Sequence, residues 1–283
     1  TPCGTLFPYT TLFRSHADHS RYGHQQYMTH HLNIPIIKHR LGEINVTGVE
    51  WNEPFSINNV KFSLHPAGHI IGSSQVRVEY KGEVWVVSGD YKTEDDGISG
   101  AFEPIKCHSF ITECTFGLPV FKWQPQDEVF EEINTWWQEN QDNNMTSIIL
   151  VYSLGKAQRV LKYLNNNIGE IYTHGAIENM TNVLREKFDF PNTHKITRET
   201  SKAKLKGNIV IAPPSAHGIT WMRKMVPYVT ASASGWMSTR GARRRRAIDK
   251  GFVLSDHADW DGLISAIKAT ECEKVICTHG YTD

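Results

Sequence analysis

The sequence predicts an α/β fold with antiparallel sheet in its first half and alternating strands and helices in its second half. Strand-like runs gather between residues 60 and 91, and from residue 126 onward strands alternate with amphipathic helices. The chain has 283 residues, of which 40% are hydrophobic, so it can bury the core of one large or two modest domains. This composition excludes a protein that is disordered throughout.

The first half of the chain is predicted to form antiparallel sheet. Val60–Leu64, Gln75–Tyr80 and Val84–Val87 are apolar or alternating runs, separated by turns that contain glycine. Connections of this kind join antiparallel neighbours. A fourth strand is predicted at Ser109–Thr112, directly before Glu113.

The second half is predicted to form parallel sheet covered by helices. A helix begins at Gln126, and its apolar residues recur on one face. These residues are Val129, Phe130, Ile133, Trp136 and Trp137. The elements that continue the alternation are the strand Ile148–Val151, the helix Lys156–Leu164, the strands Ile209–Ala212 and Gly251–Leu254, the helix Trp260–Thr270 and the strand Val275–Thr278. Strands that alternate with helices favour parallel pairing.

Composition and charge limit the classes of protein to which this chain can belong. No run of 18 apolar residues occurs and no signal peptide opens the chain, so we expect a cytoplasmic protein with no membrane partner. The five cysteines have neither the density of a disulfide scaffold nor a CxxC zinc motif, and we expect reduced thiols. The net charge is zero, but Lys195–Lys250 holds 13 Lys and Arg against 2 Asp and Glu. We therefore expect one surface that faces anions.

The two ends of the sequence carry expectations of their own. Residues 5–15, TLFPYTTLFRS, have neither helical nor strand period and resemble the translation of a DNA-sequencing adapter. We therefore expect residues 1–15 to be an artefact segment outside the fold. Because the last residues directly follow a predicted strand, we expect an interior fragment of a longer protein, truncated at both ends.

Side chains that can bind a metal ion occur in an HxDH motif and at the ends of predicted strands. The candidates are His16, Asp18, His19, His69, Asp90 and His279. Neutral imidazole and carboxylate are the usual zinc ligands. Taken singly, each could equally be an exposed loop residue, a core histidine or a turn-capping aspartate. A layered sheet would bring the strand ends to one rim, so together they favour a metal centre.

The order of these residues resembles the metallo-β-lactamase fold, in its nucleic-acid-processing branch with an inserted β-CASP domain. The strings HPAGHIIGSSQVRVEY, VVSGDYK, TECTFGLPVFKW, YSLGKAQRV, SGWMSTRGARRRR, GFVLSDHADW and THGY are similar to the bacterial ligase-associated DNA exonuclease family. The resemblance implies a four-layer αββα sandwich formed by residues 16–117 and 247–283. It also implies an inserted β-CASP-like α/β clamp at 118–246 and an active cleft between the two.

The same resemblance implies two divalent metal ions, zinc or manganese, bridged by Asp90. One ion would be held by position 14, His16 and His69, and the other by Asp18, His19 and His279. The family motif has histidine at position 14, where this sequence has Arg14. A guanidinium removes a metal bond and adds a positive charge, so we expect weak metal binding by this chain.

The implied catalytic residues are Asp18, Asp90, Glu113 and His257. Glu113 would orient His257, whose imidazole would donate a hydrogen bond or proton to the phosphoryl or leaving oxygen. Asp256 or Asp259 would accept a hydrogen bond from a metal-bound imidazole.

Basic and aromatic residues are candidates for nucleic-acid contact. The arginine run comprises Arg240, Arg243, Arg244, Arg245 and Arg246. Such a run is also typical of a solvated helix face or a targeting tract, but its place shortly before His257 favours phosphate contact. Lys156 and Arg159 follow a strand and could bind a backbone phosphate, although a full P-loop motif is absent. Trp236 could stack on a base or belong to the core.

The resemblance therefore implies a metal-dependent hydrolase that cleaves the phosphodiester bonds of DNA. Paired cations can hold the attacking and leaving oxygens and lower the pKa of water. The family implies exonuclease activity in DNA repair, with an ATP-dependent DNA ligase and a helicase as partners. Two alternatives remain, an RNA-processing β-CASP ribonuclease and a catalytically silent nucleic-acid-binding scaffold. A small-molecule thioesterase or lactamase is less favoured, because it would leave Glu113, His257 and the arginine run without a role.

Overall fold

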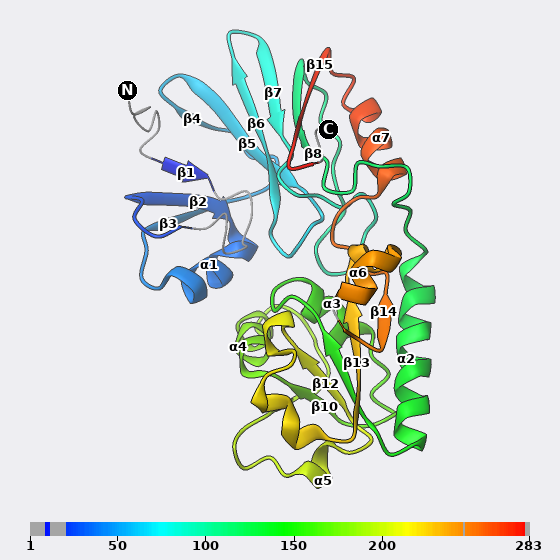
Figure 1. Cartoon of the computed structure of the whole chain (residues 1–283). Helices are drawn as coiled ribbons and strands as arrows, with labels where there is room; N and C mark the ends of the chain where they lie inside the picture. The colour runs from blue at the N-terminus through cyan, green and yellow to red at the C-terminus, as the bar shows by residue number, and fades with distance from the viewer. Residues whose placement is uncertain (1–8, 12–20, 246, 281–283) are drawn as a thin grey trace. The chain divides into compact units, whose positions relative to one another are not determined.

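The structure, a computed structural model, describes residues 9–11, 21–245 and 247–280. The chain divides into two compact units (Figure 1). Unit 1 comprises the described residues of Thr1–Lys122 and Asp256–Asp283, and unit 2 comprises those of Trp123–Ser255. The division into core and clamp at 117/118 and 246/247 stays a prediction, because compactness alone does not identify a unit as either.

Unit 1 contains a small parallel sheet with the strand order β1–β2–β3. Its elements are β1 (Tyr9–Thr11), β2 (Gln26–His30), the 3-10 helix η1 (His31–Asn33), α1 (Ile34–Leu41) and β3 (Val46–Val49). The sequence predicted no regular element in residues 5–15, and β1 differs from that expectation. Three residues are too few to show a period of two, so the pattern could not have predicted this strand.

The larger sheet of unit 1 has the order β15–β8–β7–β6–β5–β4. Its strands are β4 (Phe55–Ile57), β5 (Val60–Pro66), β6 (Ser74–Tyr80), β7 (Glu83–Val87), β8 (Ser109–Glu113) and β15 (Lys274–Thr278). Pairing is antiparallel from β4 to β7, which confirms the predicted antiparallel sheet. From β7 through β8 to β15 the pairing is parallel.

The helix α7 (Trp260–Ala269) packs on this larger sheet and its loops. Leu263 and Ala266 contact Ala67 and Tyr91 in one buried cluster. The helix begins after Asp259, whose Oδ1 accepts a hydrogen bond from Gly262 N at 2.8 Å. This N-cap, two residues after His257, fixes the start of α7 at Trp260.

Unit 2 is built on a six-stranded sheet with the order β11–β10–β12–β9–β13–β14, and every pairing is parallel, as the sequence predicted. The strands are β9 (Thr146–Leu150), β10 (Ile171–Thr173), β11 (His194–Lys195), β12 (Ile209–Ala212), β13 (Tyr228–Ala233) and β14 (Lys250–Phe252). The helices are α2 (Gln126–Asp142), α3 (Lys156–Tyr163), α4 (Gly175–Leu184), α5 (Lys202–Leu205), α6 (Arg240–Arg245) and the 3-10 helices η2 (Pro214–Ala216), η3 (Thr220–Met225) and η4 (Gly235–Ser238).

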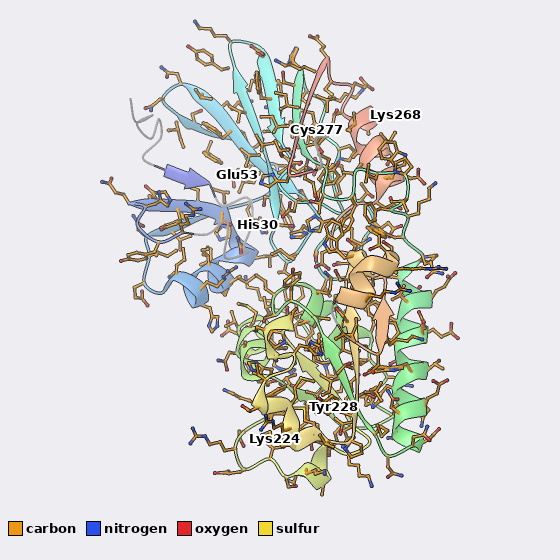
Figure 2. The ribbon with its side chains drawn as sticks, viewed as in Figure 1. His30, Glu53, Lys224, Tyr228, Lys268 and Cys277 are labelled. Atoms are coloured by element: carbon orange, nitrogen blue, oxygen red, sulfur yellow. The ribbon has the colours of Figure 1, made fainter. Side chains whose placement is uncertain are left out.

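The long helix α2 buries the apolar face that the sequence predicted. Trp136 meets the ring of Phe252 edge-on at 5.6 Å, and Phe130 stacks on Tyr163 of α3 at 4.5 Å. Figure 2 labels Tyr228, the first residue of β13, and Lys224 on the segment that leads into it. Both mark the amino edge of the sheet, so the opposite, carboxyl edge is where β9 and β13 end.

No helix in the described ranges has the length and apolar character needed to cross a membrane. Cys107, Cys114, Cys272 and Cys277 are free thiols, as predicted, and Cys3 lies outside the described residues.

Candidate metal centre

Three segments of unit 1 that are remote in sequence bring His69, Asp90 and His257 together. These residues offer ligand atoms that all lie within 4.8 Å of one another. His69 Nε2 lies 3.8 Å from Asp90 Oδ2, and His257 Nδ1 lies 3.9 Å from Asp90 Oδ1. The two imidazole rings are 4.7 Å apart. The grouping of His69 with Asp90 is the juxtaposition that a metal centre requires.

The loop that carries His69 is held against the loop that carries Asp90 by backbone contacts. Ala67 O accepts a hydrogen bond from Lys92 N at 3.1 Å. Between them, Gly68 adopts a φ of +73°, and a Cβ on it would lie 2.4 Å from the carbonyl oxygen of Lys92. Only glycine combines this conformation with this close approach. Gly68 therefore allows the two loops to meet.

The loop that carries Asp90 is also tied to the segment that carries His257. Tyr91 O accepts a hydrogen bond from Ala258 N at 2.7 Å. The ring of Tyr91 is fully buried and stacks on Phe102 at 4.8 Å. These contacts set the spacing of Asp90 and His257 through the backbone, so their side chains need not hold the loops together.

His69 is in the protonation and tautomeric state that suits a metal ligand. Its Nδ1 lies 2.9 Å from the carbonyl oxygen of Asp256, which can only accept, so Nδ1 carries the proton and Nε2 the lone pair. Burial, with the positive charge of His257, lowers the pKa of His69 to about 4. At neutral pH the imidazole is therefore uncharged and presents Nε2 toward Asp90. This donor set fits a divalent metal ion such as zinc.

Glu113 and His257 form a buried charge pair beside these ligands. His257 Nδ1 lies 2.8 and 2.9 Å from the two carboxylate oxygens of Glu113. Glu113 also accepts hydrogen bonds from Tyr91 N at 2.9 Å and from Thr115 Oγ1 at 2.5 Å. Burial opposes its ionisation, but the charge of His257 and these donors hold the pKa of Glu113 at about 2.

The pKa of His257 shifts in the opposite direction. Burial lowers it, but the carboxylate of Glu113 outweighs burial and raises the pKa above its ordinary value. His257 is therefore held as a cation over a wider pH range, with Nδ1 directed at Glu113. The ring also meets Phe116 edge-on at 5.9 Å, which fixes its plane.

The two aspartates that flank His257 have distinct positions. Asp256 accepts the hydrogen bond of His69 through its backbone carbonyl rather than through its carboxylate. Asp259 caps α7, as described above. The residue that orients the His69 imidazole is therefore Asp256, and it acts through its peptide group.

The remaining ligand candidates are less completely placed. His279 follows β15 and is exposed, and its Nδ1 lies 3.1 Å from Thr278 Oγ1. Because Thr278 pairs with Glu113, His279 leaves the sheet at the same edge as Glu113. It does not belong to the group of ligand atoms within 4.8 Å. His16, Asp18 and His19, together with Arg14, lie outside the described residues.

The predicted nucleic-acid contacts lie in unit 2 and differ in exposure. Lys156 and Arg159 are only 4% and 2% exposed. Arg159 donates from Nη1 to Ser255 O at 2.7 Å and from Nε to Gln126 Oε1 at 3.1 Å. A phosphate could reach these cations only by entering a buried environment.

The arginine run is partly described. Arg240 and Arg244 are exposed and lie four residues apart on α6, hence on one face. The side chains of Arg243 and Arg245, and all of Arg246, lie outside the described residues. Trp236 is half-buried in η4. The exposed cations of this region are therefore the arginines of α6 rather than Lys156 and Arg159.

Sequence reasoning missed two residues that hold Glu113. Thr115 donates to its carboxylate through a hydroxyl group, and Tyr91 does so through its peptide N–H. Thr115 stands two residues after Glu113 in the string TECT, a spacing that had no periodic meaning on its own. A peptide donor such as that of Tyr91 leaves no signal in the sequence.

Comparison with curated proteins finds relatives named as nucleic-acid enzymes. The chain is 31% identical over 221 residues to the "Probable DNA ligase" of Opitutus terrae, which covers 77% of this chain and 21% of that protein. It is 29% identical over 150 residues to the "RNase J-like protein" of Methanocaldococcus jannaschii, covering 47% and 34%. It is 27% identical over 119 residues to "Endoribonuclease YSH1" of Yarrowia lipolytica, covering 41% and 14%. The chain thus spans at most about a third of the length of these relatives.

No family model matches the chain. Among solved structures, a protein of unknown function from Enterococcus faecalis matches with a TM-score of 0.68 at 11% identity, over 96% of this chain and 75% of that one. That likeness concerns the fold alone. The chain is therefore a mixed α/β protein similar in sequence to proteins named as ribonucleases and to part of a protein named as a DNA ligase.

Proposed function

We propose that this protein is a metal-dependent phosphodiesterase that acts on DNA. The observation that carries the proposal is the grouping of a neutral His69 and Asp90 beside the charged pair of Glu113 and His257. A donor pair for a metal ion and a cationic acid within one site suit the hydrolysis of an anionic ester. The ribonuclease names of two relatives support this reaction class.

The fold that suits this function is the metallo-β-lactamase sandwich with a β-CASP insert. In this proposal the larger sheet of unit 1 and α7 belong to the catalytic core, and the parallel strands β9 to β13 of unit 2 belong to the clamp. The core would comprise residues 16–117 and 247–283. The same proposal makes the protein a cytoplasmic enzyme.

Two divalent ions, zinc or manganese, are the proposed cofactors. His69 and Asp90 would hold one side of the centre, and His16, Asp18, His19 and His279 are the proposed further ligands. When bound, such ions supply Lewis-acid activation of water and neutralise charge on the phosphoryl oxygens.

The chain's own residues have distinct tasks in this scheme. Glu113 stays ionised because four donor atoms surround it, and it keeps Nδ1 of His257 directed inward. The carboxylate of Glu113 thereby raises the pKa of His257, which would donate a hydrogen bond or proton from Nε2 to a phosphoryl or leaving oxygen. The carbonyl of Asp256 keeps Nε2 of His69 as the basic nitrogen.

The exonucleolytic mode and a role in DNA repair beside an ATP-dependent ligase are the finer part of the proposal. Their support is that the relative with 31% identity is named a DNA ligase, and that this chain matches only 21% of its length. A helicase is a further proposed partner. The exposed arginines of α6 are the proposed phosphate contacts.

Cleavage of matched substrates tests this function. The full chain, loaded with zinc or manganese, is incubated with end-labelled DNA and RNA of one sequence, single- and double-stranded. We expect stepwise shortening of DNA that a chelator abolishes, and no cleavage by Asp90→Ala. Cleavage of RNA with DNA left intact would instead establish the ribonuclease alternative, which the names of two relatives favour.

The third possibility, a silent scaffold, is tested with Arg14→His. If arginine at position 14 weakens a metal site, the histidine variant should bind more metal and cleave faster. Nucleic-acid binding without cleavage by both chains, at equal metal content, would establish a scaffold and refute the phosphodiesterase.

A further inference from the structure

Tyr152 is an exposed aromatic residue in the loop between β9 and α3 of unit 2. Its side chain is 55% exposed, and its backbone carbonyl accepts a hydrogen bond from Ala157 N at 3.1 Å. Lys156 Nζ lies 5.4 Å from the centre of the ring. Lys156 is itself buried in the first turn of α3, so its cation has a defined position against the ring of Tyr152.

Tyr152 follows the carboxyl end of β9 by two residues, which is where parallel α/β sheets bind ligands. Leu150, the last residue of β9, pairs with Ala212 of β12 on one side and with Ser232 of β13 on the other. After β9 the chain continues to β10, on the β12 side of the sheet, whereas after β13, the other neighbour of β9, it continues to β14 on the opposite side. The connections therefore leave in opposite directions, and Tyr152 lies at the carboxyl edge of this switch point. Open α/β sheets bind their ligands at such an edge.

Basic residues follow the strands at this same carboxyl edge. β13 ends beside β9, and the chain continues through η4 with Trp236 into α6 with the exposed Arg240 and Arg244. The stretch Lys195–Lys250 carries 13 basic and 2 acidic residues. A ligand for this edge therefore combines an anionic backbone with flat apolar groups.

We propose that Tyr152 is a stacking platform for a base of single-stranded nucleic acid. This inference rests on the proposed function and narrows its substrate. A base can stack on a side chain only when its face is exposed, which excludes the interior of a duplex. We also expect binding to tolerate changes in the base sequence of the strand, since every base has a stacking face. The protein should therefore prefer a single strand to a blunt duplex of the same length.

A second tyrosine provides a matched comparison. Tyr80 is 49% exposed, and Lys81 Nζ lies 5.2 Å from its ring centre, so its exposure and cation contact resemble those of Tyr152. Tyr80, however, closes the turn between β6 and β7, and it stands between Glu79 and Glu83. This acidic setting repels a polyanion. Tyr80 therefore controls for the loss of any exposed tyrosine.

The test measures binding by the full chain in a chelator, so that cleavage does not interfere. Fluorescence anisotropy gives the Kd for a labelled single-stranded DNA and for an abasic strand of the same length and charge. We expect Tyr152→Ser to weaken binding of the normal strand about tenfold, in line with the alanine-scan value for one stacked base. The abasic strand should bind both proteins alike, while Tyr152→Phe and Tyr80→Ser should match the wild type. Thermal melting checks that each variant is folded.

The outcomes separate this inference from the proposed function. Wild-type binding that Tyr152→Ser leaves unchanged would overturn the platform and leave the phosphodiesterase standing. Equal weakening of single-strand binding by Tyr80→Ser would overturn the stacking platform too, because the effect would not be specific to the carboxyl edge of the unit 2 sheet. A wild-type chain that binds neither strand nor duplex would overturn both proposals.

Discussion

The substitution Glu113→Gln removes the negative charge from the buried pair of Glu113 and His257 and keeps the shape of the side chain. Burial opposes ionisation of Glu113, yet His257 and the surrounding donors lower its pKa from 4.5 to about 2. That difference corresponds to about 3 kcal/mol of stabilisation once the carboxylate is ionised. We expect the free energy of unfolding of unit 1 in the metal-free variant to fall by about this amount near pH 6. Removal of one partner from a buried pair costs a similar amount, about 3–5 kcal/mol.

The pH dependence of this loss follows from both members of the pair. The pKa of Glu113 is lowered in the folded state, so its contribution is complete above about pH 4.5 and decreases as the pH falls toward 2. The pKa of His257 is raised, because Glu113 outweighs burial, so its contribution is complete below pH 6.5 and decreases as the pH rises through the folded value. Wild type and variant should differ most between pH 4.5 and 6.5.

Native-state hydrogen exchange of peptides from β8 measures this difference locally, which avoids interference from unit 2. The matched control is Glu79→Gln, which removes a half-buried carboxylate of β6, paired with Arg77 on the same sheet, and should leave exchange in β8 unchanged. A loss below about 1 kcal/mol near pH 6 would refute the reasoning. A loss of equal size at pH 5 and pH 9 would refute it as well, because a charge pair cannot be indifferent to the ionisation of its members.

Three further predictions concern the metal ligands, the loop contact and the basic surface. Asp90→Ala should abolish both metal binding and cleavage, whereas His257→Ala should abolish cleavage and retain most of the metal; equal metal loss, measured by atomic absorption, would make His257 a ligand. Gly68→Ala should cost about 1–3 kcal/mol and lower zinc affinity, because its Cβ meets a carbonyl oxygen, while Gly82→Ala, whose Cβ meets nothing within 4 Å, should cost only about 1 kcal/mol. Equal melting temperatures of the two glycine variants would contradict this account. Arg244→Ala should reduce the slope of log Kd against log salt for single-stranded DNA by about one, and an unchanged slope would exclude it as a phosphate contact.

The antiparallel strands and α2 could be predicted because their residues repeat with a clear period. β5, β6 and β7 contain five to seven residues each, and α2 contains 17, enough for alternation or a helical face to appear. β10 and β11 contain three and two residues, so no period could have predicted them. Their pairing depends on neighbouring strands that are remote in sequence.

The candidate site could be predicted only as a set of residue types. His69, Asp90, Glu113 and His257 stood out through their chemistry, and the structure brings them together. The burial of Arg159 could not have been foreseen, since it depends on the carbonyl of Ser255, almost a hundred residues later. A sequence pattern does not reveal which polar group a remote backbone atom will engage.

The loops of the candidate metal centre are joined mainly by peptide groups, and this has a consequence for substitution. Lys92 N bonds Ala67 O, Ala258 N bonds Tyr91 O, and His69 donates to the carbonyl of Asp256. Substitutions that leave the backbone in place do not move these bonds, whereas a Cβ at Gly68 would push against the carbonyl oxygen of Lys92 and shift the two loops. The geometry of the centre is thus set by the backbone, and its chemistry by a few side chains. The proposed activity would therefore be lost through Asp90 with the fold kept, and through Gly68 with every proposed ligand kept.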